Sequence, residues 1–78
     1  MEPRIIAFSH KMNVDLDDDY TLYEDGTVLH EYDKHRYPGG YNLKETLQAK
    51  NIKDSAKERL LNVAKEEDKE LAKELLGL

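Results

Sequence analysis

Aspartate residues gather between positions 15 and 19, and carboxylate oxygens are the ligands that calcium prefers in proteins. Asp15, Asp17 and Asp19 have the spacing of the first three ligands of an EF-hand loop. The glycine that this loop requires is replaced by Tyr20, and its twelfth position holds Gly26 instead of glutamate. The segment therefore fits a solvated acidic loop or an acidic docking surface better than a calcium site, and we assign it no metal.

A second polar group lies in the segment His-Glu-Tyr-Asp-Lys-His at positions 30–35. Its two histidines are five residues apart, whereas a zinc-binding helix places them four apart on one face. On a strand, Glu31, Asp33 and His35 would project to one side. Such a trio is usually a solvated strand edge. A small metal- or ligand-binding protein that uses residues 15–19 or this trio is kept as an alternative.

Nucleophilic catalysis needs a serine or threonine beside a positioned base. Ser9 and His10 are adjacent, but neighbours on a strand point to opposite faces. Gly39 and Gly40 are not followed by the lysine of a phosphate-binding loop. We therefore predict that the protein is not an enzyme and uses no cofactor.

The charge of the chain is unevenly distributed. The formal net charge is −5, and residues 15–33 contain eight acidic and no basic residues, whereas residues 42–78 are balanced. This field repels nucleic acid and anionic membranes and attracts a basic partner. The chain has no cysteine, and its N-terminal apolar run is too short for a signal peptide or a membrane span. We therefore expect a cytoplasmic protein that binds neither nucleic acid nor membranes.

All five tyrosines lie between positions 20 and 41. Tyrosine is favoured at recognition surfaces because it offers a large contact area with a polar tip at low entropic cost. We predict a small regulatory or protein-interaction module that binds another protein, one with a basic surface, through an acidic, tyrosine-rich hairpin. The predicted binding residues are Asp17, Asp18, Asp19, Tyr23, Asp25, Tyr32 and Tyr37. A homodimer formed through the open face of the sheet is a further alternative.

The elements that would position these residues follow from two changes of pattern. The first half of the chain is rich in β-branched and aromatic residues, and the second half is rich in Ala, Leu, Glu and Lys. This order predicts one α+β domain over residues 1–78, with a three-stranded antiparallel meander in residues 1–36 and two or three short helices in residues 42–78. The first strand, 4–12, would place Ile6, Phe8, His10 and Met12 on one face, and residues 13–19 would form a loop.

Residues 20–32 predict a hairpin, because two β-prone runs flank Glu24-Asp25-Gly26. Gly26 supplies the positive φ that a tight turn demands. A two-residue turn would pair Tyr23 with Val28. We predict instead a three-residue loop with a glycine bulge, which pairs Leu22 with Val28.

The second half carries helix signals. Asn42 and Glu45 predict a capped short helix over 42–50, whose apolar side is Leu43 and Leu47. A second helix is expected to begin at Asp54 or Ser55, with a buried stripe of Leu60, Leu61, Val63 and Ala64. One helix could run over 55–76, but we predict a break near 65–68 because a compact core needs the last helix to fold back. Gly77 predicts the final helix stop, with Leu78 packing on the last turn.

Overall fold

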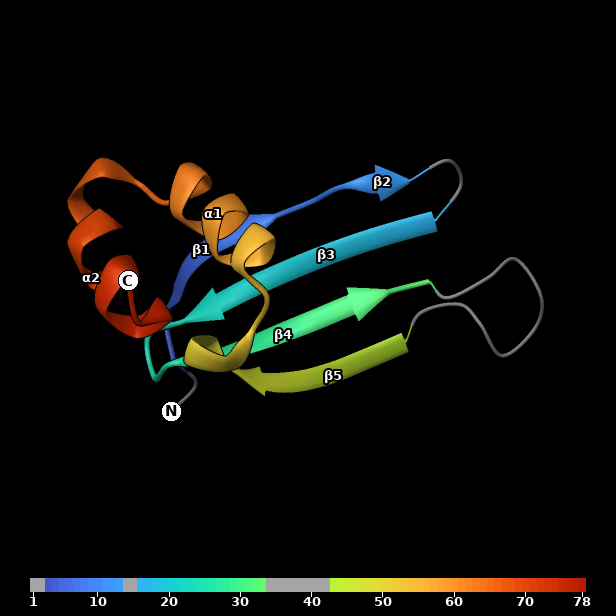
Figure 1. The fold of residues 1–78 in the computed structure, drawn as a ribbon, viewed down its shortest axis with the longest axis horizontal. Helices are drawn as coiled ribbons and strands as arrows, with labels where there is room; N and C mark the ends of the chain where they lie inside the picture. Colours follow the sequence, from blue (N-terminus) through green and yellow to red (C-terminus); the bar gives the residue numbers. More distant parts are fainter. Residues whose placement is uncertain (1–2, 14–15, 34–42) are drawn as a thin grey trace.

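The computed structural model describes residues 3–13, 16–33 and 43–78 and shows an α+β fold with an antiparallel sheet and two helices. The strands are β1 (Ile5–Ser9), β2 (Met12–Asn13), β3 (Leu16–Tyr23), β4 (Thr27–Tyr32) and β5 (Leu43–Gln48). Four of them lie in the order β1-β3-β4-β5, and β2 continues the line of β1 along β3. The helices α1 (Asp54–Val63) and α2 (Lys69–Leu76) gather over one end of the sheet (Figure 1). The α+β prediction is confirmed.

The predicted hairpin is confirmed in its turn and in its register. Leu22 pairs with Val28, and Gly26 has a φ of 87°. The carboxylate of Asp25 accepts hydrogen bonds from both the backbone N–H and the hydroxyl of Thr27, which closes the loop. Tyr20, Leu22, Val28 and His30 therefore share one face, as predicted.

The first strand departs from simple alternation. Ile5 pairs with Tyr23 and Ala7 pairs with Leu22, so Ile6 is one extra residue in the ladder. This bulge turns both Ile6 and Ala7 into the core. From Phe8 onward the side chains alternate regularly, but Phe8 lies on the opposite face of the sheet from Ile6. The prediction that Ile6 and Phe8 share one face is therefore wrong.

The expected loop over 13–19 is wrong, because β3 begins at Leu16. Met12 pairs with Asp17, and the backbone N–H of Asp18 donates to the carbonyl of Lys11. These bonds extend the ladder past the end of β1. Asp17, Asp18 and Asp19 consequently alternate across the sheet instead of projecting together from a loop.

The helix predicted over 42–50 is also wrong. Leu43–Gln48 form strand β5, and only Ala49–Asn51 form one turn of 3-10 helix. The spacing of Leu43 and Leu47 suits a helix, but it also suits one face of a strand. On β5, Leu47 pairs with Val28 and packs against the core. Pairing with β4 satisfies a whole edge of backbone groups, and this outweighs the local helical preference. In the described residues the sheet therefore has four neighbouring strands, with β2 extending the line of β1, in place of the predicted three. Asn42 lies outside the described residues.

The two remaining helices follow the prediction, with three differences in detail. The chain breaks after Val63 and passes through a 3-10 turn, Glu66–Asp68, before α2 begins at Lys69. Gly77 ends α2 with a φ of 76°. However, Lys53 caps α1 without a side-chain bond, although Ser55 and Glu58 have the spacing of a capping box. Val63 and Leu78 are exposed, so neither packs inside.

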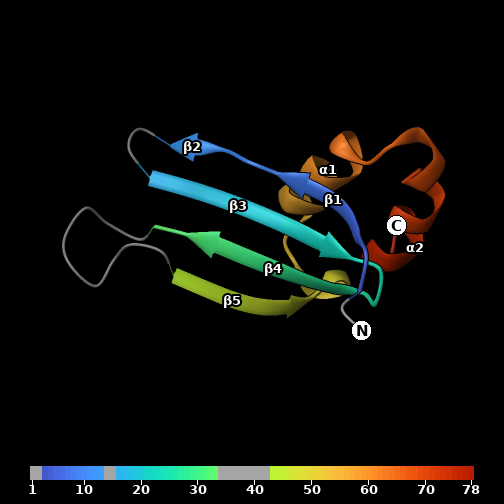
Figure 2. The same cartoon turned by 180° about the vertical axis from the view of Figure 1, so that it is seen from behind.

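The core lies between the sheet and the helices and joins both halves of the chain. Its fully buried side chains are largest at Leu22, Val28, Leu60 and Leu76. Figure 2, seen from the opposite side, faces β3, β4 and β5 with no helix in front of them. The sheet therefore has a covered face and an open face. Among the described residues, no helix is long and apolar enough to cross a membrane.

Candidate functional site

The covered face holds a charged cluster around His30, at the border of the region that α1 covers. The imidazole Nε2 lies 2.6 Å from Oδ1 of Asp18, and Nδ1 lies 3.0 Å from Oε1 of Glu45. The rings of Tyr20 and Tyr32 stack on the two sides of the imidazole, at centroid distances of 4.3 and 4.4 Å. Strands β3, β4 and β5 all contribute to this cluster.

Arg59 of α1 joins the same cluster. Its guanidinium donates to Oδ2 of Asp18 at 3.0 Å, to the carbonyl of Asp18 at 2.8 Å and to the hydroxyl of Ser9 at 3.1 Å. It also lies 5.0 Å from the centre of the Tyr20 ring, a cation–π distance. Arg59 therefore fastens α1 to β1 and β3. Because carboxylates occupy both nitrogens of His30, neither nitrogen is available to a substrate, and the cluster acts as a structural tie.

The open face is organised in rows that run across the strands. The two rows nearest the hairpin turn contain no charged residue: Ile5, Tyr23, Thr27 and Gln48, then Phe8, Thr21, Leu29 and Thr46. Ile5 and Phe8 are 56% and 51% exposed. A shallow pocket of about 330 Å³ lies among them, lined by Pro3, Tyr23, Thr27, Leu29 and Thr46. This part of the open face is the apolar half.

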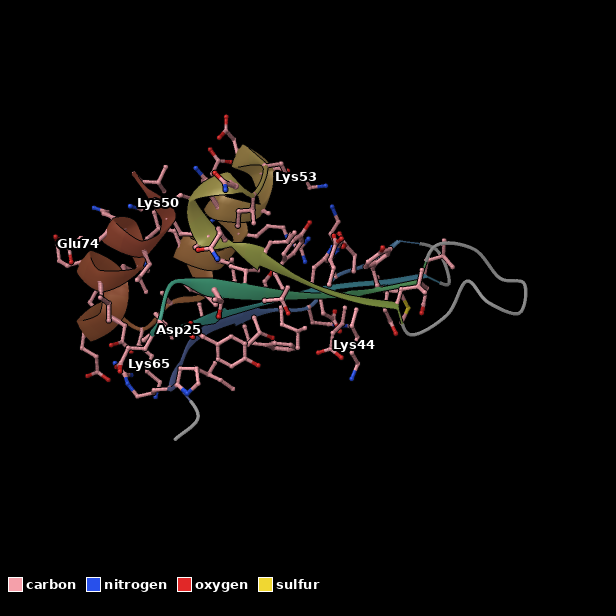
Figure 3. The ribbon with its side chains drawn as sticks, turned by 90° about the horizontal axis from the view of Figure 1, so that it is seen from below. Asp25, Lys44, Lys50, Lys53, Lys65 and Glu74 are labelled. Carbon is pink, nitrogen blue, oxygen red and sulfur yellow. The ribbon has the colours of Figure 1, made fainter. Side chains whose placement is uncertain are left out.

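The other two rows of the open face are acidic. A second pocket, of about 240 Å³, is lined by Asp17, Asp19, Glu31, Tyr32, Asp33 and Lys44. The four carboxylates and one ammonium among these residues give a net charge of three negative charges. This part of the open face is the acidic half. The ammonium of Lys44 lies 3.8 Å from a carboxylate oxygen of Glu31, so the two form an ion pair. Figure 3 shows Lys44 on the opposite side of the sheet from Lys53, which precedes α1.

Two further side chains border the acidic half on the β1–β2 side. The imidazole of His10 lies 2.6 Å from a carboxylate oxygen of Asp19. Met12 pairs with Asp17 and is 57% exposed. One oxygen of Asp17, Oδ1, is buried and has no hydrogen-bond partner among the described residues. Exposed apolar groups and unbalanced carboxylates therefore stand side by side on one surface.

The predicted binding residues are divided between the two faces. Asp17, Asp19 and Tyr23 lie on the open face, and Asp25 lies in the turn beside it. Asp18 and Tyr32 lie on the covered face, within the His30 cluster, and Tyr32 also borders the acidic pocket. Tyr37 lies outside the described residues, as do Asp15 and His35 of the metal-binding alternatives. A tyrosine-rich surface is thus only partly assembled by the described residues, because Tyr20 and Tyr32 stack inward on His30.

Sequence reasoning missed the exposed apolar residues of the open face. Simple alternation over residues 4–12 places Phe8 and Met12 on one face with Ile6. The bulge at Ile6 separates them from the core, and no residue in the sequence marks it. Sequence reasoning also missed Arg59, whose partners Ser9 and Asp18 are 50 and 41 residues away in the chain.

Acid is expected to destabilise the protein because it protonates the carboxylates of Asp18 and Asp68. Burial opposes ionisation of Asp18, but hydrogen bonds from His30 and Arg59 outweigh it and hold its pKa below the ordinary 3.8. A hydrogen bond from Arg4 lowers the pKa of Asp68 in the same way. The resulting stability is present above pH 3.8 and is lost as the pH falls through the lowered values.

Thermal unfolding followed by circular dichroism from pH 6 to pH 2 measures this loss. The Asp68→Asn variant, which keeps an oxygen acceptor but cannot ionise, is expected to show a shallower decline. A melting temperature that stays constant down to pH 3 would contradict the assignment.

The described residues contain no group of three or more His, Asp or Glu side chains placed to hold a metal ion. Comparisons with family models, with curated proteins and with solved structures find no significant match to this chain, so its function has to be inferred from the geometry of the two faces.

Proposed function

We propose that the protein is a non-enzymatic interaction module whose open face binds another protein, at a surface where a basic side chain lies beside apolar ones. The observation that carries this proposal is the exposure of Ile5, Phe8 and Met12, each more than half accessible, beside an acidic half with three net negative charges. Large apolar patches that a soluble protein leaves exposed usually mark sites of interaction.

The two halves of the open face would do different work. Covering a half-exposed side chain such as Phe8 contributes about 1 kcal/mol, because full burial of a large apolar side chain is worth about 1.5–3 kcal/mol. The acidic half would accelerate association with a basic partner and orient it, and salt screens this effect. Affinity would therefore come mainly from the apolar half, and specificity from the acidic half.

Charge complementarity favours a different protein over a second copy of this chain. In a twofold dimer through the open face, the acidic half of one copy would meet either the acidic half or the apolar half of the other. The first arrangement brings like charges together, and the second desolvates unpaired carboxylates. Lys44 is the one basic residue that lines either pocket of the open face in the described parts of the chain.

The Phe8→Ser variant is expected to weaken partner binding by about fivefold, which corresponds to about 1 kcal/mol. The matched control is Val63→Ser, because Val63 is a similarly exposed apolar residue on α1. Random peptides selected on the wild-type protein by surface display provide the ligands, and calorimetry measures their affinities for each variant. The selected peptides should combine lysine or arginine with apolar residues.

A second pair of variants tests the acidic half. Asp19→Asn with Glu31→Gln should lower the association rate at low salt and remove most of its salt dependence. Glu66→Gln with Glu67→Gln changes the net charge equally on the exposed turn before α2 and should leave the salt dependence in place. Peptides that lack basic residues, or that bind the Phe8 variant and the wild type equally, would refute the proposed function.

A further inference from the structure

The geometry around His30 links its two hydrogen bonds to the number of protons on its ring. A neutral imidazole has a single N–H and can donate to one acceptor only. Both nitrogens of His30 lie within hydrogen-bond distance of carboxylate oxygens, which accept and do not donate when ionised. Both contacts are hydrogen bonds to ionised carboxylates at the same time only when the ring carries two N–H groups, one directed at Asp18 and the other at Glu45.

The groups around His30 favour this charged form together. Asp18 and Tyr20 face it from β3, Tyr32 from β4 and Glu45 from β5, and Arg59 of α1 reaches it through Asp18. Two carboxylates balance one guanidinium and one imidazolium, so the cluster is neutral only when His30 carries its proton. The faces of the two stacked tyrosine rings also attract a cation.

We propose that His30 is a proton-operated latch that holds the edge strand β5 to the sheet. When His30 loses its proton, one of its two hydrogen bonds must be lost. The bond to Asp18 is the shorter one, and Arg59 holds that carboxylate in place. Glu45 is 46% exposed, so its carboxylate can turn to water. The tie to Glu45 is therefore the one that opens.

Opening this tie acts on β5 before it acts on the rest of the fold. Within the described residues β5 pairs with β4 alone, so it is an edge strand. Helix α1 is fastened elsewhere, through Arg59 to Ser9 and Asp18. Strand β5 also carries Lys44 and Thr46 at the margin of the open face. A rise in pH would loosen this margin while the core stays packed.

Hydrogen exchange measured by NMR tests the latch without any binding partner, so the result is independent of the proposed function. Nitrogen chemical shifts of the His30 ring report its protonation between pH 5.5 and 8.5. Exchange of the β4–β5 amides, corrected for intrinsic rates, reports local opening. We expect both nitrogens to be protonated at the low end, and protection of the β4–β5 amides to fall by about tenfold as the proton leaves.

Three variants complete the test. Glu45→Ala removes the exposed acceptor and should abolish the pH-dependent step in β5 protection without disturbing the core. His30→Asn should abolish it as well. His10→Asn, which removes the other histidine–carboxylate pair of the described chain, should leave the step unchanged. A His30 ring with one N–H throughout the range, or β5 protection that stays constant while the proton leaves, would overturn the proposal.

Discussion

Leu60→Ala is expected to lower the free energy of unfolding by about 2–5 kcal/mol, the largest effect of any change considered. Leu60 is completely buried, on the side of α1 that packs against the sheet, and it belongs to the same core cluster as Leu22, Val28 and Leu76. Removing its three outer carbon atoms costs their transfer free energy and leaves a cavity that the neighbours fill only in part. A domain of this length has a total stability of about 4–12 kcal/mol, so the variant should lose a large fraction of it.

Val63→Ala on the same helix is the control for Leu60→Ala. Val63 is 49% exposed, and the change removes two carbon atoms that are largely in contact with water. Its effect should stay below about 1 kcal/mol, because surface substitutions usually shift stability by about 0.5 kcal/mol. Urea unfolding of both variants measures the difference. Equal losses for Leu60 and Val63 would show that α1 does not pack as described.

Arg59→Met is expected to cost about 2–3 kcal/mol, because methionine keeps much of the apolar stem but removes the guanidinium. The change deletes hydrogen bonds to Ser9 and Asp18 and leaves the carboxylate of Asp18 mostly buried, with His30 as its remaining side-chain partner. Removing one partner of a largely buried ion pair is costly because the other charge loses its compensation. Only 19% of the Arg59 side chain is exposed, so water cannot fully replace it.

Two controls separate the guanidinium from the other effects of this change. Lys57→Met removes a positive charge from the same helix and should cost less than about 0.5 kcal/mol. Arg59→Lys keeps the charge but not the planar fork of donors, and should fall between the wild type and Arg59→Met. Thermal and urea unfolding give the order. If Arg59→Met were as stable as Lys57→Met, the tie between α1 and the sheet would contribute nothing measurable.

The elements that the sequence predicts correctly are those defined by a local rule. The hairpin follows from Gly26, because few other residues adopt a φ of 87° without strain. The end of α2 follows from Gly77 for the same reason. The break before α2 is the exception, because it is predicted from the need of a compact core to fold the last helix back, and the structure has it after Val63. The other two signals are local. Each of these signals spans a few residues and can be recognised without knowing what the segment packs against.

The errors in the fold are places where distant contacts decide. Leu43 and Leu47 satisfy a helix pattern, and the free edge of β4 makes them a strand. The acidic residues at 17–19 resemble a loop, and pairing with β2 and β4 makes them part of β3. In both segments the backbone gains a complete ladder of hydrogen bonds from a partner strand. That gain exceeds the propensity differences between residues, which are usually less than 1 kcal/mol.

The candidate site shows the same division. Composition and charge distribution alone determine an acidic segment with clustered tyrosines, and they predict a protein-binding role. Only the tertiary structure decides which of these residues act together. The bulge at Ile6 places Phe8 on the open face, and the His30 cluster draws Asp18 and Tyr32 to the covered one. The physical reason is that a shift of one residue in the pairing register moves a side chain to the opposite face of the sheet. The register in turn depends on backbone pairing between segments far apart in the chain.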